Sequence, residues 1–223
     1  MYHFKASATL GLAVLSLLAI APDPSYAQNR IPSGTVAAQV LGRVRLNSDF
    51  SVNLYGYFTY MEGIQTSIFN GPPSENTATF TFSAEPTNAA LFKNGDLVHA
   101  LENPVNGQYT TLSVYYNPAP SSRDLANPDD FKQGSLVAQF RSRAGAVNVL
   151  PSKTFQASAG LSLLSTSVVF LNGQALTIGS LVSTMSLNLF GPSPSFDDIL
   201  AGLGTDGSYT IPFSGTGTAA AIQ

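Results

Sequence analysis

Residues 34–46 read Gly-Thr-Val-Ala-Ala-Gln-Val-Leu-Gly-Arg-Val-Arg-Leu, and residues 50–60 read Phe-Ser-Val-Asn-Leu-Tyr-Gly-Tyr-Phe-Thr-Tyr. Apolar and polar side chains alternate in both runs, and the even positions of the first run, from Val36 to Leu46, are apolar or glycine. A period of two is typical of β-strands with one buried face and one wet face. The Asn47-Ser48-Asp49 link between the runs therefore predicts a β-hairpin.

The same alternation recurs along the rest of the chain, between turn sequences rich in Gly, Asn, Asp and Pro. Further strands are expected at residues 77–82, 97–101, 108–116, 135–143, 180–189, 208–213 and 216–222. Asn172-Gly173 predicts a two-residue hairpin turn, and Asn127 and Ser195 are expected to cap short helical turns. This spacing predicts an all-β fold, either an antiparallel β-sandwich, which we place first, or a closed β-barrel.

The composition sets the class of protein. Only 10% of the 223 residues are charged, against roughly 25% in an average soluble protein. The net charge is −3, and no basic tract is present that would neutralise phosphates, so we expect no nucleic-acid partner. No linker divides the chain, and residues 28–223 are expected to form one all-β domain.

The first 27 residues have the order of a secretory signal peptide. A cationic start with Lys5 is followed by an apolar run at residues 8–20 and by small residues at Ser25 and Ala27. The apolar run is too short for a membrane span, and we expect none in the mature chain. The sequence predicts cleavage near Ala27 and a secreted or periplasmic protein. A lack of Asn-x-Ser/Thr sequons favours a bacterial source.

Residue types exclude several kinds of chemistry. The chain has no cysteine, which removes disulfides and thiolate sites. Its mature part has one histidine, His99, so a multi-histidine metal site is excluded, and no Gly-x-Ser-x-Gly motif accompanies it. Acidic pairs at Asp129-Asp130 and Asp197-Asp198 are better explained as helix starts than as calcium ligands. We therefore expect no metal, no cofactor and no catalytic constellation.

Carboxylates are the remaining general acids and bases. Four glutamates are expected near strand ends and loops, where a glycosidase could place its catalytic pair: Glu62, Glu75, Glu85 and Glu102. Their separation in space does not follow from the sequence. A carboxylate-dependent polysaccharide hydrolase or lyase is therefore an alternative to a non-enzymatic role.

The polar face of residues 50–60 holds the affirmative candidate for binding. Tyr55 and Tyr57 share this face with Asn53 and Thr59. If the face is open, the two rings form a flat platform flanked by hydrogen-bonding groups, which suits a sugar ring or a surface partner. If the face is covered, the same tyrosines are packing residues.

These observations favour an exported, non-enzymatic β domain that binds a glycan or another extracytoplasmic ligand. A structural envelope or matrix protein is the third alternative, and it predicts self-association.

Overall fold

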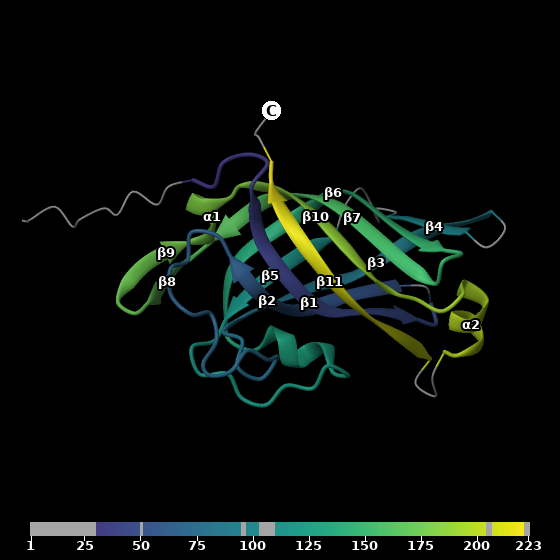
Figure 1. Ribbon diagram of the computed structural model, residues 1–223, viewed down its shortest axis with the longest axis horizontal. Coiled ribbons are helices and arrows are strands. Elements are labelled where there is room, and N and C mark those ends of the chain that lie inside the picture. Colours follow the sequence, from purple (N-terminus) through teal and green to yellow (C-terminus); the bar gives the residue numbers. More distant parts are fainter. Residues whose placement is uncertain (1–29, 50, 95–96, 103–109, 204–206, 221–223) are drawn as a thin grey trace, which may run out of the picture.

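The computed structural model describes residues 30–49, 51–94, 97–102, 110–203 and 207–220 (Figure 1). The strands are β1 (Val36–Asn47), β2 (Ser51–Met61), β3 (Phe80–Asn94), β4 (Leu97–Glu102), β5 (Thr111–Tyr116), β6 (Ser135–Leu150), β7 (Thr154–Thr166), β8 (Val168–Leu171), β9 (Gln174–Thr177), β10 (Thr184–Pro192) and β11 (Ser208–Ala219). The helices are the 3₁₀ turn η1 (Pro128–Lys132) and the short α-helices α1 (Ile178–Leu181) and α2 (Phe196–Ala201).

The strands form a closed antiparallel barrel of eight strands. Neighbouring strands pair in the order β2, β1, β11, β10, β7, β6, and the pairing of β2 with β3 completes the ring. β4 and β5 share one position between β3 and β6, since each pairs with a different half of those two long strands. The barrel, which we placed second, is therefore the architecture that forms, and closure leaves no free sheet edge.

Alternation in the first two strands places many of the even-numbered side chains in the interior, although Val36 and Tyr60 are exposed. Val40 and Val44 of β1 are buried in the barrel interior, while Gln39 of the same strand is exposed. The β1–β2 hairpin is also confirmed, with Leu46 opposite Val52 near its turn. The pairing register of β1 and β2 shifts by one residue between Gln39 and Val40. As a result, Phe58 and Met61 of β2 are both buried although they are three positions apart.

Aromatic and aliphatic side chains fill the interior of the barrel. Its widest side chains include six buried phenylalanines: Phe58, Phe80, Phe82, Phe140, Phe155 and Phe213. Each contributes about 2 kcal/mol through burial. A cavity of about 20 Å³ remains near Phe58 and Met185, enough for about one water molecule. The interior around these residues is thus a packed core.

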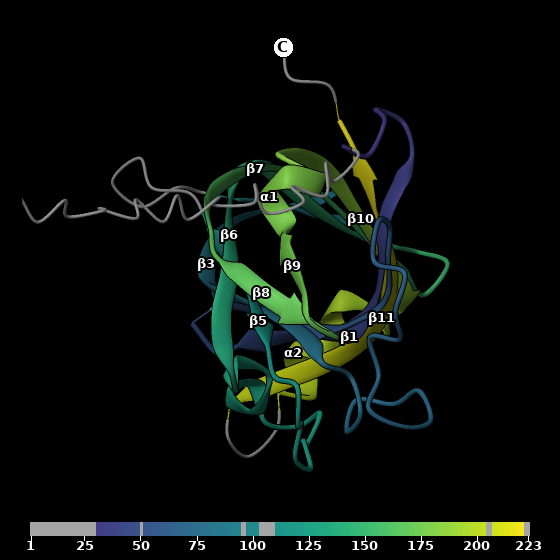
Figure 2. The ribbon, with the colours of Figure 1, turned by 90° about the vertical axis from the view of Figure 1, so that its left-hand side faces the viewer.

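The β8–β9 hairpin and α1 cover one mouth of the barrel (Figure 2). Asn172 and Gly173 have φ of 50° and 82°, the left-handed pair that a two-residue hairpin turn requires, so this predicted turn is confirmed. Val169 and Leu176 point from the hairpin into the core. At the other end lies α2, which buries Ile199 (Figure 1).

Both predicted helix caps are present. Asn127 accepts a hydrogen bond from the backbone N–H of Asp129, and Ser195 accepts one from that of Asp198. Among the described residues, no helix is long and apolar enough to cross a membrane.

Several predicted strand boundaries are wrong, because proline and glycine, which usually mark turns, also occur at bulges and close contacts inside strands. Pro86, read as a break, lies inside β3, where the register with β2 shifts between Val52 and Leu54. Gly145 lies inside β6 and follows a second irregularity. Gly215 lies inside β11, where an added Cβ would lie 2.3 Å from Leu189.

Candidate ligand-binding surface

The four residues that the sequence singled out lie on β2, and the structure covers the tyrosines among them. Tyr55 is fully buried and Tyr57 is 9% exposed, while Asn53 and Thr59 are half-buried. Asn53 accepts a hydrogen bond from the Asn47 amide at 2.8 Å. These residues therefore do not present an open aromatic platform, and glycan binding at them stays a prediction that would require their cover to move.

The cover consists of residues 63–79 and 117–134, which pack on the outside of the barrel. The Tyr55 ring lies 5.4 Å from that of Phe131, and the Tyr57 ring stands edge-on to Phe69 at 6.5 Å. Arg123 is buried in this layer and donates from Nη1 to the carbonyl oxygens of Glu75 and Ala78 at 2.6 and 2.7 Å. This layer is therefore a second small core beside the main one.

Burial also sets the acidity of the two tyrosines. It raises the pKa of the Tyr55 phenol above its ordinary value, against the opposing effect of nearby Arg45. It raises the pKa of Tyr57 in the same way, and the negative charge of Glu75 adds to the effect. Both phenols are neutral hydrogen-bonding groups at physiological pH.

Of the titratable candidates, the structure describes the side chains of Glu62 and Glu75, and it places them in different regions. His99 lies on β4 between Phe92 and Asn148 on the neighbouring strands, and its side chain lies outside the described part, as do those of Glu85 and Glu102. Glu62 lines a cavity near the β8–β9 hairpin, whereas Glu75 lies in the layer over β2. Among the described residues, no three acidic, histidine or cysteine side chains gather as a metal site.

A different surface, on the outer wall formed by β1, β11, β10 and β7, carries an exposed aromatic ring. The ladder places Leu41, Ser214, Phe190 and Gln156 in one row across the four strands. Phe190 is 56% exposed and Leu41 is 39% exposed, while Ser214 between them is small. The small side chain of Ser214 therefore leaves a depression between the apolar side chains of Leu41 and Phe190.

The next row on the same wall is polar. It consists of Gln39, Thr216, Asn188 and Ser158, paired in that order. Amide and hydroxyl groups thus lie two residues along the strands from Phe190 and Ser214, a spacing of about 7 Å. A ring and a line of donors and acceptors share one side of the barrel.

Two prolines end the pairing of β10 with β11 and open the wall. The ladder between these strands stops at Phe190 and Ser214, although β10 stays paired with β7 as far as Pro192. β11 likewise stays paired with β1 beyond Pro212. Proline has no N–H to donate, so the ladder between the two strands cannot continue there.

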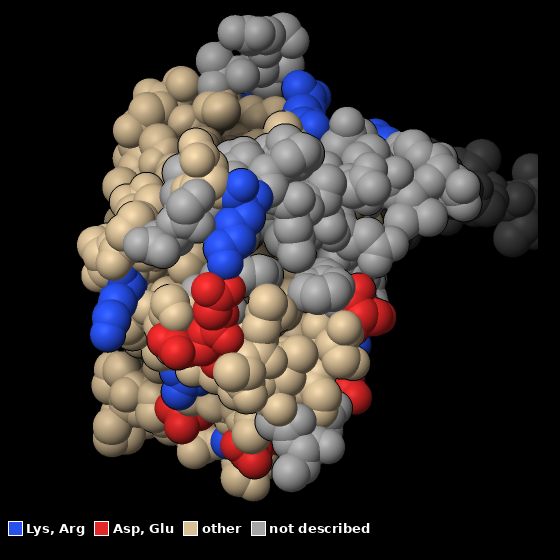
Figure 3. Space-filling model, turned by 90° about the vertical axis from the view of Figure 1, so that its right-hand side faces the viewer, with Lys and Arg blue, Asp and Glu red and all other residues tan. Residues whose placement is uncertain are grey.

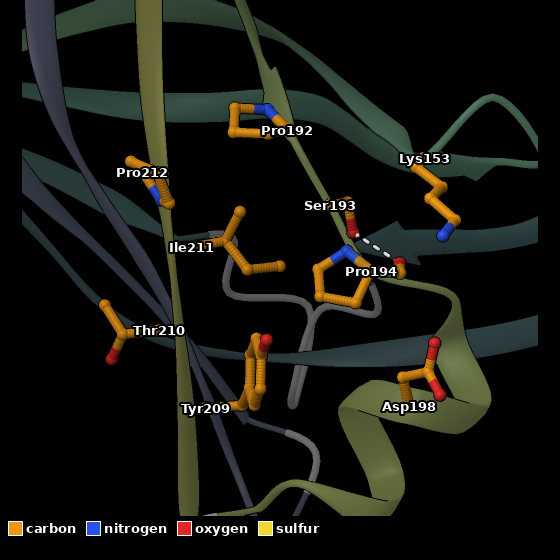
Figure 4. Close-up of a pocket in the computed structure, with 9 residues that line it drawn as sticks. All are labelled: Lys153, Pro192, Ser193, Pro194, Asp198, Tyr209, Thr210, Ile211 and Pro212. Carbon is orange, nitrogen blue, oxygen red and sulfur yellow. Dashed lines mark hydrogen bonds between the residues drawn. The ribbon is translucent and has the colours of Figure 1, made fainter.

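Two adjoining hollows result, and both are lined by Pro192 and Pro212. The first, about 570 Å³, lies beside Phe190 and Leu41. The second, about 430 Å³, is shown in Figure 4, where Tyr209 and Ile211 point from β11 toward Pro194. We call the two hollows together the wall groove.

Charge is nearly absent along the groove. Residues 154–196 contain no Asp, Glu, Lys or Arg, and β11 contains none. Lys153 and Asp198 stand at one end, near α2. On that end of the molecule positive and negative side chains form small mixed groups, as with Lys93 and Asp197, whose charged atoms lie 2.7 Å apart (Figure 3). The larger hollow therefore has no charged lining residue, although Arg43 and Arg45 of β1 pair with Pro212 and Thr210, which line the groove.

No protein-family model, curated protein or solved structure matches this chain.

The alternation of the sequence could have placed Phe190 on the outward face of its strand. The expected strand at residues 180–189 stops one position before Phe190, which continues the outward register of Ser186 and Asn188. A single exposed aromatic residue is common on protein surfaces, so Phe190 becomes a candidate for binding only together with the hollow beside it. The hollow beside it was not visible, because it depends on four strands meeting.

Proposed function

We propose that this protein is an exported, non-enzymatic binding protein that holds a neutral glycan in the wall groove. The observation that carries the proposal is the exposed ring of Phe190 beside a hollow of about 570 Å³ whose lining residues carry no charge. Sugar rings present apolar C–H faces that stack on aromatic rings, and hydroxyl groups that bond to amides and hydroxyls. Phe190 and the row that contains Asn188 and Thr216 supply both kinds of contact.

The absence of charge along the groove supports a neutral ligand. An anionic polysaccharide gains little here, since the lining has one cation, Lys153, and that residue stands beside the carboxylate of Asp198 at one end. Burying a charged ligand group against apolar walls without a partner is unfavourable. Hydroxyl-rich, uncharged sugar units avoid that cost.

The lining also supports binding rather than hydrolysis. Glycosidases use two carboxyl groups about 5–10 Å apart. The lining residues of the wall groove include one carboxylate, Asp198, and its Oδ2 accepts a hydrogen bond from Ser195 Oγ at 2.6 Å as part of the α2 cap. That carboxylate has a structural role at the helix start.

Export follows from the signal peptide predicted at residues 1–27, and glycans of cell surfaces or surroundings would then be accessible. A barrel without free edges, stabilised without disulfides, suits that setting.

Affinity electrophoresis in native gels that contain soluble polysaccharides tests the proposal. We expect retardation by a neutral polymer such as a β-glucan or a xylan, and not by an anionic alginate. Phe190→Ala should weaken binding about tenfold, since stacking contributes about 0.5–1.5 kcal/mol. Phe170→Ala is the matched control, because Phe170 is 67% exposed on the β8–β9 hairpin, away from the groove.

Equal retardation of both variants would overturn the groove as the site, and a lack of retardation by every neutral polymer would overturn the function. The Tyr55 face makes a different prediction in the same gels. Binding at that face would be weakened by Tyr57→Ala and unaffected by Phe190→Ala.

A further inference from the structure

A separate cavity of about 890 Å³ lies at the hairpin-covered end of the barrel. Four chain segments line it: residues 30–32 before β1, residues 62–66 after β2, the β8–β9 hairpin, and Leu181 of α1. Its volume is within the range of about 300–1,000 Å³ that is usual for small-molecule sites. It shares no lining residue with the wall groove.

The lining of this cavity contains one cation and one anion. Arg30 donates to Ser183 Oγ, and Glu62 accepts from the Tyr60 hydroxyl. Within the described part of the chain, neither Arg30 nor Glu62 is in an ion pair. A guanidinium has five N–H donors and a carboxylate about four acceptor positions, so both groups retain bonding capacity for a ligand.

The remainder of the lining is mainly apolar, and a backbone hydrogen bond fixes two of the segments that form it. Ile64, Leu171, Leu176 and Leu181 provide the apolar surface. The N–H of Ile31 donates to the Leu181 carbonyl oxygen at 3.0 Å, which ties the segment of Arg30 to α1.

At the second charged residue of the lining, the N–H of Glu62 donates to the Ala37 carbonyl oxygen at 2.8 Å. Gly63 follows with φ of +82°, and an added Cβ there would lie 2.7 Å from Leu181. The backbone at both charged residues is therefore fixed before a ligand binds, which reduces the entropy lost on binding.

We propose that this cavity is a second binding site, for a short apolar peptide with both termini free. The peptide carboxylate pairs with Arg30, its ammonium group pairs with Glu62, and its side chains contact Ile64 and Leu171. A ligand with one charge would engage only one of the two charged groups, and a neutral ligand would engage neither. Opposite charges on one apolar molecule match the lining.

Isothermal titration calorimetry of the purified protein with leucyl-leucine tests the site. The same titration with N-acetyl-leucyl-leucine and with leucyl-leucine amide removes one charge of the peptide at a time. We expect each capped peptide to bind about tenfold more weakly than the free dipeptide, the loss of one charge-assisted contact. Equal binding of all three peptides, or no binding at millimolar concentration, would overturn the proposal.

Two variants assign the charges. Arg30→Gln should abolish the preference for a free carboxylate while keeping the preference for a free amino group. Glu62→Gln should do the reverse. Gln174→Ala, at an uncharged lining position, should keep both preferences. An unchanged pattern in Arg30→Gln and Glu62→Gln would contradict the assignment even if the dipeptide binds. Failure of neutral glycans to bind has no bearing on this result, because the two sites share no residue.

Discussion

The hydroxyl group of Tyr55 donates a hydrogen bond to the carbonyl oxygen of Leu125 at 3.0 Å, between residues seventy positions apart in the chain. The bond joins the outer face of β2 to the layer that covers it. Thr81 makes a second link of this kind, from its Oγ1 to the carbonyl oxygen of Phe131 at 2.8 Å. Because the layer is anchored by both strands, the outer face of β2 is an interior surface.

Removing the Tyr55 hydroxyl should destabilise the protein. We expect Tyr55→Phe to lower the free energy of unfolding by about 1 kcal/mol, the net contribution of one hydrogen bond, and Tyr55→Ala by about 3–5 kcal/mol through the cavity it leaves. Tyr60→Phe is the control, because Tyr60 is 41% exposed and should cost under about 0.5 kcal/mol. Chemical denaturation measures all three. A Tyr55→Phe protein as stable as the unmodified one would show that the link is not formed.

Alkaline pH should unfold the protein through the buried tyrosines. The pKa of Tyr55 is raised above 10.0 by burial in the folded state, so the folded protein holds this proton more tightly than the unfolded chain. That stabilisation is complete below pH 10 and is lost as the pH rises through the folded pKa. The melting temperature should therefore fall above about pH 10, and less steeply in Tyr55→Phe. Identical pH profiles for the two proteins would contradict the effect.

The glycine pair of the first hairpin should be sensitive to a single methyl group. Gly42 lies opposite Gly56 in the hairpin. A Cβ added to Gly42 would lie 2.2 Å from the carbonyl oxygen of Tyr55, and a Cβ added to Gly56 would lie 2.1 Å from the carbonyl oxygen of Leu41. Gly42→Ala should cost about 3 kcal/mol through overpacking.

Gly160 on β7 is the matched control for this experiment, because no heavy atom lies within 4 Å of an added Cβ there. Gly160→Ala should be neutral or stabilise the protein by about 0.5–1 kcal/mol, since alanine loses less backbone entropy on folding. Thermal unfolding of both variants measures the difference. Equal effects at the two positions would show that the strands separate easily at Gly42.

Export should remove the first 27 residues. Intact-mass analysis of the protein from the extracytoplasmic fraction should give a chain that begins at Gln28. Ala27→Arg should block this processing, because a large charged side chain does not fit the small-residue cleavage site. Gln28→Ala, one residue beyond the expected cut, is the control and should be processed normally. A protein that retains Met1 after export would contradict the predicted signal peptide.

The period-two alternation of the sequence predicted most of the strands. In strand β1 the even positions from Ala38 to Val44 are buried as predicted, whereas Val36 is exposed, and the turn at Asn172-Gly173 follows from the residue types that accept positive φ. Irregular strands were harder to predict. Pro86 and Gly215 are turn formers in most settings, and here a bulge and a close contact place them within strands.

The candidate site could be predicted only in part for the same reason. Tyr55 and Tyr57 were correctly assigned to the face opposite the dry register, but a strand pattern does not reveal which loops pack on that face. Phe190 is the reverse case, since a residue of a type that is usually buried remains exposed on the wall.

By itself the sequence determined which side of each regular strand is dry, where the hairpin turns and helix caps lie, and that cysteine and multi-histidine chemistry is excluded. These properties depend on neighbouring residues and on residue type. Tertiary structure alone decided between sandwich and barrel, covered Tyr55, and opened the groove at Pro192 and Pro212. Those outcomes depend on contacts between segments far apart in the chain, and alternation is the same whether a strand's partners close a ring or form a second sheet.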